Sequence, residues 1–390
     1  MRELPAAAVV AVTNKRPQAL LLIILSLYLV DIAAAVLPED RADALFHSYD
    51  GGGVEITGPS VLVRKSFSDS VSGSLHHYVD NVSSASIDVV TTASPYSESR
   101  TENSIALDYL HNKTLMSMGM TKSVEPDFDA STISINFSQD MFGDLTTVNM
   151  GFAMGDNIVG RNGDSSFDEQ ATTRNYRLSV SQVISKNLIM AVAFETISDE
   201  GFLNNPYRSV RYLDPTTPQQ YSFQAEVYPR TRSSNALSLR ARYFLERRAA
   251  IFASYRIYGD SWGISANTLE LGYTLPLRSN WILESRIRYY DQSGADFYSD
   301  LFPFQDAQNF LARDKELSSF SDLTLGVGVS YEFDNRTWST FKRGSLSFYY
   351  DYILFDYEDF RDLTQPGSVG NEPLYSFNAG IIRAFASLWF

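Results

Sequence analysis

The sequence contains no cysteine, and it has only 4 histidines and 4 tryptophans among 390 residues. The absence of cysteine excludes a disulfide-stabilised scaffold, a cysteine zinc site, an iron–sulfur cluster and a thiol nucleophile. Basic residues are also in deficit, because 32 Lys and Arg stand against 46 Asp and Glu, which gives a net charge of -14. An acidic chain is poorly suited to bind nucleic-acid phosphates, so we expect no nucleic-acid partner.

The sequence also lacks an apolar run of transmembrane-helix length, which is about 20 residues. Its clearest apolar run, residues 19–30, is too short to span a bilayer. Lys15 and Arg16 precede this run, and Ala33-Ala34-Ala35 follows it as an A-x-A cleavage site. Basic residues, a short apolar run and small residues in this order predict a secretory signal peptide over residues 1–35. The alternative is a buried core helix.

Alternation of apolar and polar residues with a period of two fills much of the remaining chain. In residues 322–333 every odd position from Leu323 to Phe333 is apolar, and every even position is polar or glycine. This period is the pattern of a β-strand with two different faces. Such segments are about 9–12 residues long, the length of a tilted strand that crosses a bilayer. Aromatic residues near segment ends, such as Tyr289, Tyr350, Phe355 and Tyr357, suggest interfacial girdles.

These patterns predict an all-β fold, a transmembrane antiparallel β-barrel in the outer membrane of a Gram-negative bacterium. Only helices and closed barrels span lipid, because backbone groups cannot remain unpaired there. Such a barrel would contact outer-membrane lipid and lipopolysaccharide, and divalent cations at external acidic loops could bridge it to the latter. The alternative is a secreted soluble β-protein that buries its apolar face against a second sheet.

The strand count is predicted to be 16–18. Sixteen strands begin near Val54, Ser70, Thr101, Lys113, Ala130, Thr146, Thr173, Asn187, Tyr221, Ser234, Ala249, Ala266, Trp281, Asp322, Gly344 and Ser376. Loops of the C-terminal half alternate between short and long, as expected for such barrels. In the N-terminal half the short and long loops fall at the wrong positions for this alternation. Two additional strands, in 207–214 and 86–93, would restore the alternation and raise the count to eighteen.

The predicted domains are a signal peptide (1–35), an N-terminal extension or plug (36–53) and the barrel (54–390). Asp50-Gly51-Gly52-Gly53 lacks the Gly-Lys-Ser/Thr of a phosphate loop, so a flexible hinge fits better. Residues 81–100 are Ser/Thr-rich and are a second candidate for a plug. The chain ends in Phe390 after an alternating strand that includes Leu388, which resembles the signal recognised by the outer-membrane assembly machinery. Phe385 replaces the glycine of the fuller signal.

The chain resembles an uncharacterised family of Gram-negative outer-membrane proteins, a domain of unknown function. The resemblance is carried by His47–Gly53, Val63–Ser66, Tyr78–Asp80, Ser83–Val89, Thr92–Tyr96, Arg100–Glu102, Asp108–Leu110 and Met141–Thr147, and more loosely by Arg208–Tyr212 and Phe297–Asp300. It covers essentially all of the chain after the predicted signal peptide. The resemblance implies the location and the barrel, and it implies no activity.

Catalytic and metal-binding motifs are weak. None of His47, His76, His77 and His111 has a serine two residues later, the arrangement of outer-membrane lipases, and no G-x-S-x-G turn is present. A protease site built from Asp and His side chains is not excluded by the sequence. His76 and His77 should point to opposite faces of a strand and cannot share an ion. The acidic loop 161–170 lacks the spacing of a calcium loop.

The predicted lumen face is the most informative feature. Where tyrosines such as Tyr243 and Tyr352 face lipid, the opposite face is charged, and a charge facing lipid costs about 2–4 kcal/mol near the midplane. The residues expected to line the lumen are Arg240, Arg242, Arg256, Arg286, Arg288, Glu270, Glu284 and Asp351. They would select small ions or polar solutes, or they would pair across strands as a polar core.

The leading hypothesis from sequence is therefore a pore or transporter for small polar or charged solutes. A closed structural or assembly barrel that binds a periplasmic or external partner is the alternative, and an outer-membrane hydrolase is a third. No cofactor is predicted.

Overall fold

The computed structural model describes residues 36–84, 96–277, 280–334 and 340–390, and strands dominate these residues. The predicted signal peptide and residues 86–93 lie outside the described residues. The first nine strands are β1 (Arg41–Gly51), β2 (Val54–Ser68), β3 (Val71–Ser84), β4 (Tyr96–His111), β5 (Thr114–Glu125), β6 (Phe128–Met141), β7 (Thr146–Arg161), β8 (Asp164–Ser185) and β9 (Leu188–Gly201). The others are β10 (Ser209–Leu213), β11 (Tyr221–Ala225), β12 (Thr231–Phe244), β13 (Ala250–Asp260), β14 (Ser265–Pro276), β15 (Trp281–Gln292), β16 (Phe320–Asp334), β17 (Arg343–Arg361) and β18 (Leu374–Trp389), with one short 3-10 helix, η1 (Lys315–Leu317).

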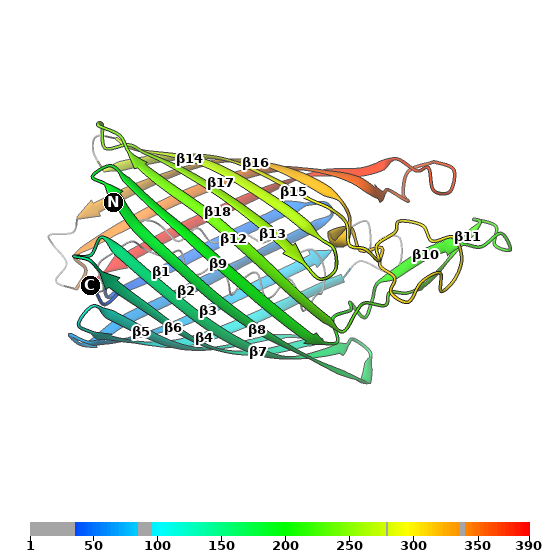
Figure 1. Cartoon of the computed structure of the whole chain (residues 1–390), viewed down its shortest axis with the longest axis horizontal. Helices are drawn as coiled ribbons and strands as arrows, with labels where there is room; N and C mark the ends of the chain where they lie inside the picture. The colour runs from blue at the N-terminus through cyan, green and yellow to red at the C-terminus, as the bar shows by residue number, and fades with distance from the viewer. Residues whose placement is uncertain (1–35, 85–95, 278–279, 335–339) are drawn as a thin grey trace.

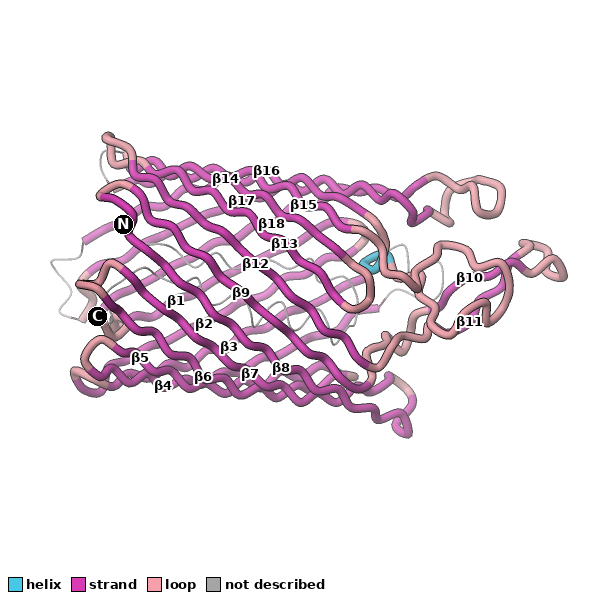
Figure 2. The backbone as a smooth tube through the Cα atoms, viewed as in Figure 1, coloured by secondary structure: helices cyan, strands magenta, loops and turns pink. Residues whose placement is uncertain are grey.

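Sixteen of these strands, β1–β9 and β12–β18, form one closed antiparallel barrel (Figures 1 and 2). The barrel closes where β1 pairs with β18, from Arg41 opposite Trp389 to Gly51 opposite Ala379. Closure pairs every strand edge, which a strand surrounded by lipid requires. The predicted transmembrane antiparallel barrel is confirmed, with sixteen strands. No helix among the described residues is long and apolar enough to cross a membrane.

Strand β1 corrects the predicted N-terminal extension or plug. Residues 41–51 pair with both β18 and β2 and so complete the barrel wall. The glycine run that suggested a hinge is instead a tight turn between β1 and β2. Gly52 and Gly53 both have positive φ angles (59° and 75°), which residues with a Cβ rarely adopt.

The hairpin β10–β11 corrects the strand predicted near Tyr221. The two strands pair only with each other, from Ser209 opposite Ala225 to Leu213 opposite Tyr221, while β9 pairs directly with β12. The additional strand predicted in residues 207–214 is therefore present as β10, but it lies outside the barrel. The phase error of the N-terminal half arose because β1 was missed and β11 was counted in its place.

The two ends of the barrel differ in their connections. Arg41 and Trp389 lie at one end, here called the terminal end, where β2–β3 and β8–β9 are joined by tight turns at 69–70 and 186–187. The other end, here called the loop end, carries residues 202–230, 293–319 and 362–373. In Figure 1 the hairpin β10–β11 projects from the loop end, away from the barrel. The long connections predicted for the C-terminal half, at 291–318 and 358–375, are confirmed, and so is the short one at 246–248; the short one at 278–280 includes residues outside the described part of the chain.

Large apolar side chains cover the outer surface of the barrel. The outward positions of β16 include Leu325 and Val327, which are 48% and 61% exposed, and those of β5 include Met118, which is 59% exposed. A continuous band of such residues would be unfavourable in water and suits contact with lipid. His77 points outward beside Asn103 (2.8 Å) at the loop-end edge of this band.

Inside the barrel, an apolar layer lies near the loop end. Its buried members come from β1–β3, β17 and β18, and Phe355 stacks on Phe377 with ring centroids 4.5 Å apart. Phe355 and Tyr357 therefore point inward, 8% and 6% exposed, which corrects their predicted place in an interfacial girdle. Tyr289 and Tyr350 do lie on the outer surface, 48% and 39% exposed.

Candidate functional site in the barrel lumen

The structure places the predicted lumen residues on the inner face of strands β12–β15 and β17. Their outward neighbours on the same strands, such as Leu239, Tyr255 and Ile287, are 42–44% exposed. Side chains alternate between the faces of a strand, so the positions between these apolar residues face the lumen. The eight residues are Arg240 and Arg242 on β12, Arg256 on β13, Glu270 on β14, Glu284, Arg286 and Arg288 on β15, and Asp351 on β17.

Ion pairs connect most of the lumen arginines to carboxylates on other strands. Arg286 donates to Asp351 at 2.8 Å, and Arg383, which was not predicted from the sequence, donates to the same carboxylate at 2.5 Å. The other pairs are Arg288–Asp322 at 2.7 Å, Arg177–Glu195 at 2.8 Å, Arg256–Glu195 at 3.6 Å and Arg286–Glu270 at 3.8 Å. Pairing across strands, one of the two predicted roles for these residues, is thus extensive.

Two glycines of β16 make room for these contacts. Gly326 faces the lumen between β15 and β17, and a Cβ there would lie 2.2 Å from an oxygen of Asp351 and 2.7 Å from Arg286. A Cβ on Gly328 would lie 2.3 Å from the ring of Tyr349, whose hydroxyl donates to Glu284 at 2.5 Å. Side chains of β15 and β17 therefore meet over a strand that carries none at these positions.

Strands β12–β15 lie directly across the lumen from β2–β5, because opposite strands in this ring of sixteen are eight places apart. The inner face of β12–β15, here called the arginine-rich wall, carries Arg232, Arg240, Arg242, Arg256, Arg286 and Arg288 against Asp260, Glu270 and Glu284. The inner face of β2–β5, here called the acidic wall, carries Asp80, Glu98, Glu102, Asp108 and Glu125 against Arg64 and Arg100. The two walls have an excess of charge of opposite sign.

The residues of the acidic wall were not predicted from the sequence. Arg100 is its centre, since it contacts Glu102 at 2.6 Å, Asp80 at 3.6 Å and Glu125 at 3.8 Å. Alternation at even positions of residues 98–108 carried the signal. The prediction of a plug over residues 81–100 hid this pattern. The structure instead places 81–84 in β3 and 96–100 in β4.

Two histidines make hydrogen bonds in the lumen. His47 bonds Asp80 at 2.7 Å and stacks on Tyr78, and His76 bonds the hydroxyl of Ser60 at 2.7 Å. Within the described residues no carboxylate hydrogen-bonds to His76, so the Ser60–His76 pair lacks the acid of a catalytic triad. His76 and His77 point to opposite faces of β3, as expected.

The predicted acidic loop 161–170 is a strand region. β7 extends to Arg161 and β8 begins at Asp164, so only Asn162 and Gly163 form the turn. Asp164 accepts hydrogen bonds from the backbone N–H and the hydroxyl of Ser166 at 3.1 and 2.6 Å. Among the residues that the structure describes, no group of three or more His, Asp or Glu side chains is arranged to hold a metal ion.

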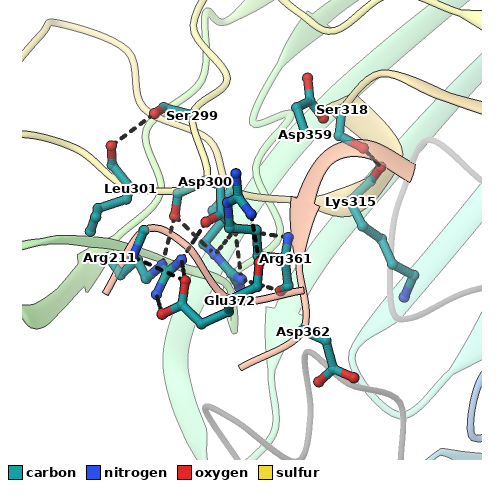
Figure 3. Close-up of polar contacts among 12 residues, drawn as sticks. Arg211, Ser299, Asp300, Leu301, Lys315, Ser318, Asp359, Arg361, Asp362 and Glu372 are labelled. Carbon is teal, nitrogen blue, oxygen red and sulfur yellow. Dashed lines mark hydrogen bonds and ion pairs between the residues drawn. The ribbon is translucent and has the colours of Figure 1, made fainter. Parts of the chain in front are cut away.

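A buried ionic cluster ties together three segments at the loop end (Figure 3). Arg211 of β10 is 0% exposed and donates to Glu372 of the β17–β18 loop at 2.7 and 3.0 Å. It also contacts the carboxylate of Asp300 in the β15–β16 loop, and its Nε donates to the Asp300 carbonyl at 2.9 Å. Arg313 contacts Asp300 at 2.9 Å from the same loop. These residues fix the loop-end segments, here called the cap, in one arrangement.

The electrostatics of Glu372 reflect this cluster. Burial raises the pKa of its carboxyl, but hydrogen bonds and charge from Arg211 outweigh burial and lower the pKa below its usual range. The glutamate is therefore ionised in the cap, and its charge is neutralised by the guanidinium.

The predicted assembly-signal residues lie at the terminal end, where the barrel closes. Leu388 is part of β18, opposite Ala42 of β1. Phe390 follows the strand, and its backbone N–H donates to the carbonyl of Asp40 at 3.3 Å. Its ring contacts Phe341 with centroids 6.3 Å apart.

The sequence matches a family described as "Protein of unknown function (DUF3570)" over residues 76–175 and 163–375, well over half of the chain. The chain belongs to the DUF3570 family. The resemblance expected from the sequence to an uncharacterised barrel family is thereby confirmed. No curated protein is similar to this DUF3570 chain in sequence.

Among solved structures, this DUF3570 barrel is similar to a bacterial polysaccharide outer membrane secretin, with 7% identity and a TM-score of 0.49, over 90% of this chain and 99% of the other. It is also similar to a loop L8 deletion mutant of OmpT, an outer membrane protein of Vibrio cholerae, with 10% identity and a TM-score of 0.43, over 90% of this chain and 99% of the other. Similarity at this level says nothing about a solute or a partner.

Proposed function

We propose that this DUF3570 protein is an outer-membrane pore or transporter for small polar or charged solutes. The observation that carries the proposal is the opposition of the arginine-rich wall on β12–β15 and the acidic wall on β2–β5 across one lumen. Rings and patches of charged side chains of this kind set the selectivity of pores.

The charge excess on each wall supports a role beyond a polar core. The arginine-rich wall carries six arginines against three carboxylates of its own, and Arg256, Arg286 and Arg288 find carboxylates on strands β9, β17 and β16 outside the wall. Charges of opposite sign on facing walls create a field across the lumen, and low-dielectric walls focus it. A polar or charged solute would be oriented by that field as it passes.

The location completes the proposal. The outward apolar band suits lipid and lipopolysaccharide as surroundings, and residues 1–35 would direct export as a cleaved signal peptide. The terminal end would then face the periplasm and the cap the exterior. Phe390 and Leu388, at the closing strand β18, would serve recognition by the assembly machinery.

Osmotic swelling of proteoliposomes tests this function. Vesicles that contain the full chain should swell in small sugars and amino acids at rates that fall with solute size. Vesicles with heat-denatured protein serve as the control. Swelling no faster than in the control for every small solute would contradict a pore.

The cap favours a second candidate, a closed barrel that binds a partner. The cap is fixed by the fully buried Arg211 and stands beside an apolar layer inside the barrel mouth. A rigid surface at the loop end suits recognition of a periplasmic or external partner. A barrel that neither swells vesicles nor conducts ions would favour this candidate.

A further inference from the structure

Arg240 is set apart from the other arginines of the lumen by its surroundings. Arg177, Arg256, Arg286, Arg288 and Arg383 each have a carboxylate oxygen within 4 Å. Arg240 makes no hydrogen bond or ion pair with any residue that the structure describes. Its register neighbours are small, with Ala191 on β9 and Ser254 on β13, so no acidic side chain stands beside it on either strand.

The nearest charges around Arg240 balance one another, so the positive charge of Arg240 itself is left over. Its electrostatic neighbours are Arg177, Arg256, Glu195 and Glu270. Both carboxylates are already engaged, because Glu195 pairs with Arg177 and Arg256, and Glu270 pairs with Arg286 at 3.8 Å. Arg240 is half-buried near other arginines, and the N–H donors of its guanidinium make no hydrogen bond to the described residues. Such an arginine attracts an anion.

We propose that Arg240 is the anion-binding point of the lumen and takes the oxyanion of a small solute, a carboxylate or a phosphate. The planar guanidinium presents two parallel N–H donors, which match two oxygens of either group. Ala191 and Ser254 leave space beside it for that group. The inference rests on the proposed pore and names the class of its solute.

The test is titration calorimetry of the full chain in detergent with inorganic phosphate and, separately, succinate. At least one of them should bind to the unaltered chain, and Arg240→Gln should weaken that binding by about tenfold or more, since hydrogen bonds to charged groups of this kind are strong. Arg240→Lys keeps the positive charge but lacks the two parallel N–H donors, so its affinity for the anion should lie between those of the unaltered chain and Arg240→Gln. Arg174→Gln is the matched control, because Arg174 is on the outer face of β8.

The outcomes separate the anion site from the pore. Binding of neither anion, unchanged binding in Arg240→Gln, or an equal loss in Arg174→Gln would overturn the site. If Arg240→Gln fails to fold, as judged by the gel-mobility shift of a folded barrel on heating, then Arg240→Lys must show the loss. A barrel that conducts ions but binds no anion would refute the anion site alone. A barrel that binds an anion but does not conduct ions would refute the pore alone.

Discussion

Arg286 and Asp351 form an ion pair that crosses strand β16 directly over Gly326. The Nε of Arg286 donates to Asp351 at 2.8 Å, although the two residues belong to strands that are not neighbours. The contact exists because position 326 carries no side chain. A glycine inside a strand usually weakens it, and here the glycine allows a charged pair to form in the lumen.

Gly326→Ala should therefore destabilise the barrel. The added Cβ would overlap Asp351 and Arg286, and overpacking of this kind costs about 1–3 kcal/mol. Gly272→Ala is the matched control, because its Cβ would meet nothing closer than Phe252 at 3.5 Å. Urea unfolding of the refolded barrel in detergent measures both. Equal stability of the two variants would contradict the packing described at Gly326.

Asp351→Asn should cost more than any substitution of an exposed carboxylate. Asp351 is 1% exposed and accepts from both Arg286 and Arg383, so its loss leaves two guanidinium groups without their shared partner. Removing one member of a buried charge pair costs about 3–5 kcal/mol. Asp356→Asn, outward and exposed on the same strand, is the control. A loss in urea unfolding no larger than that of the control would refute the shared pairing.

The cap should loosen when Arg211 is replaced by methionine. The substitution leaves the buried carboxylate of Glu372 without its guanidinium and leaves Asp300 with Arg313 alone, which costs about 3–5 kcal/mol. Arg230→Met removes an exposed pair with Glu169 and should cost less than about 1 kcal/mol. Hydrogen exchange of the amides in 209–225 reports the opening of the cap. Unchanged exchange in Arg211→Met would show that another contact holds the cap.

The cap should also open in acid. Because Arg211 lowers the pKa of Glu372, the ionised carboxyl stabilises the cap fully above the pKa of an unfolded glutamate, about 4.3. That stabilisation is lost as the pH falls through the lower pKa of the folded group. Because the sequence has no cysteine, the substitutions Gln219→Cys and Gln365→Cys provide the only two sites for spin labels. The distribution of distances between the two labels should broaden on acidification. Glu372→Gln should flatten this dependence, and an equal response in both proteins would assign it to another group.

The sequence predicted the strand pattern well because alternation is a local property. The outward and inward faces of residues 322–333 follow directly from the period of two. The same signal cannot say which sheet a strand joins, so Tyr221–Ala225 was counted as barrel wall although it pairs only in the hairpin. β1 was missed because its end is Gly51, and the glycines that form its turn suggested a hinge.

The contacts of the site could not be predicted, because they depend on register and on strands distant in sequence. Asp351 meets Arg286 only because β16 places Gly326 between them. The acidic wall faces the arginine-rich wall only because the ring contains sixteen strands and its order is known. Arg211, Asp300 and Glu372 come from three separate segments whose meeting no local pattern indicates.

Single-channel recording in planar bilayers tests the central claim most directly. The full chain, refolded in detergent and inserted under a potassium chloride gradient, should give discrete conductance steps. Its reversal potential should move toward cation selectivity when Arg242 and Arg288 of the arginine-rich wall are replaced by glutamine. A correctly folded barrel that remains electrically silent would contradict the pore, and a reversal potential unmoved by these substitutions would contradict the role of the wall.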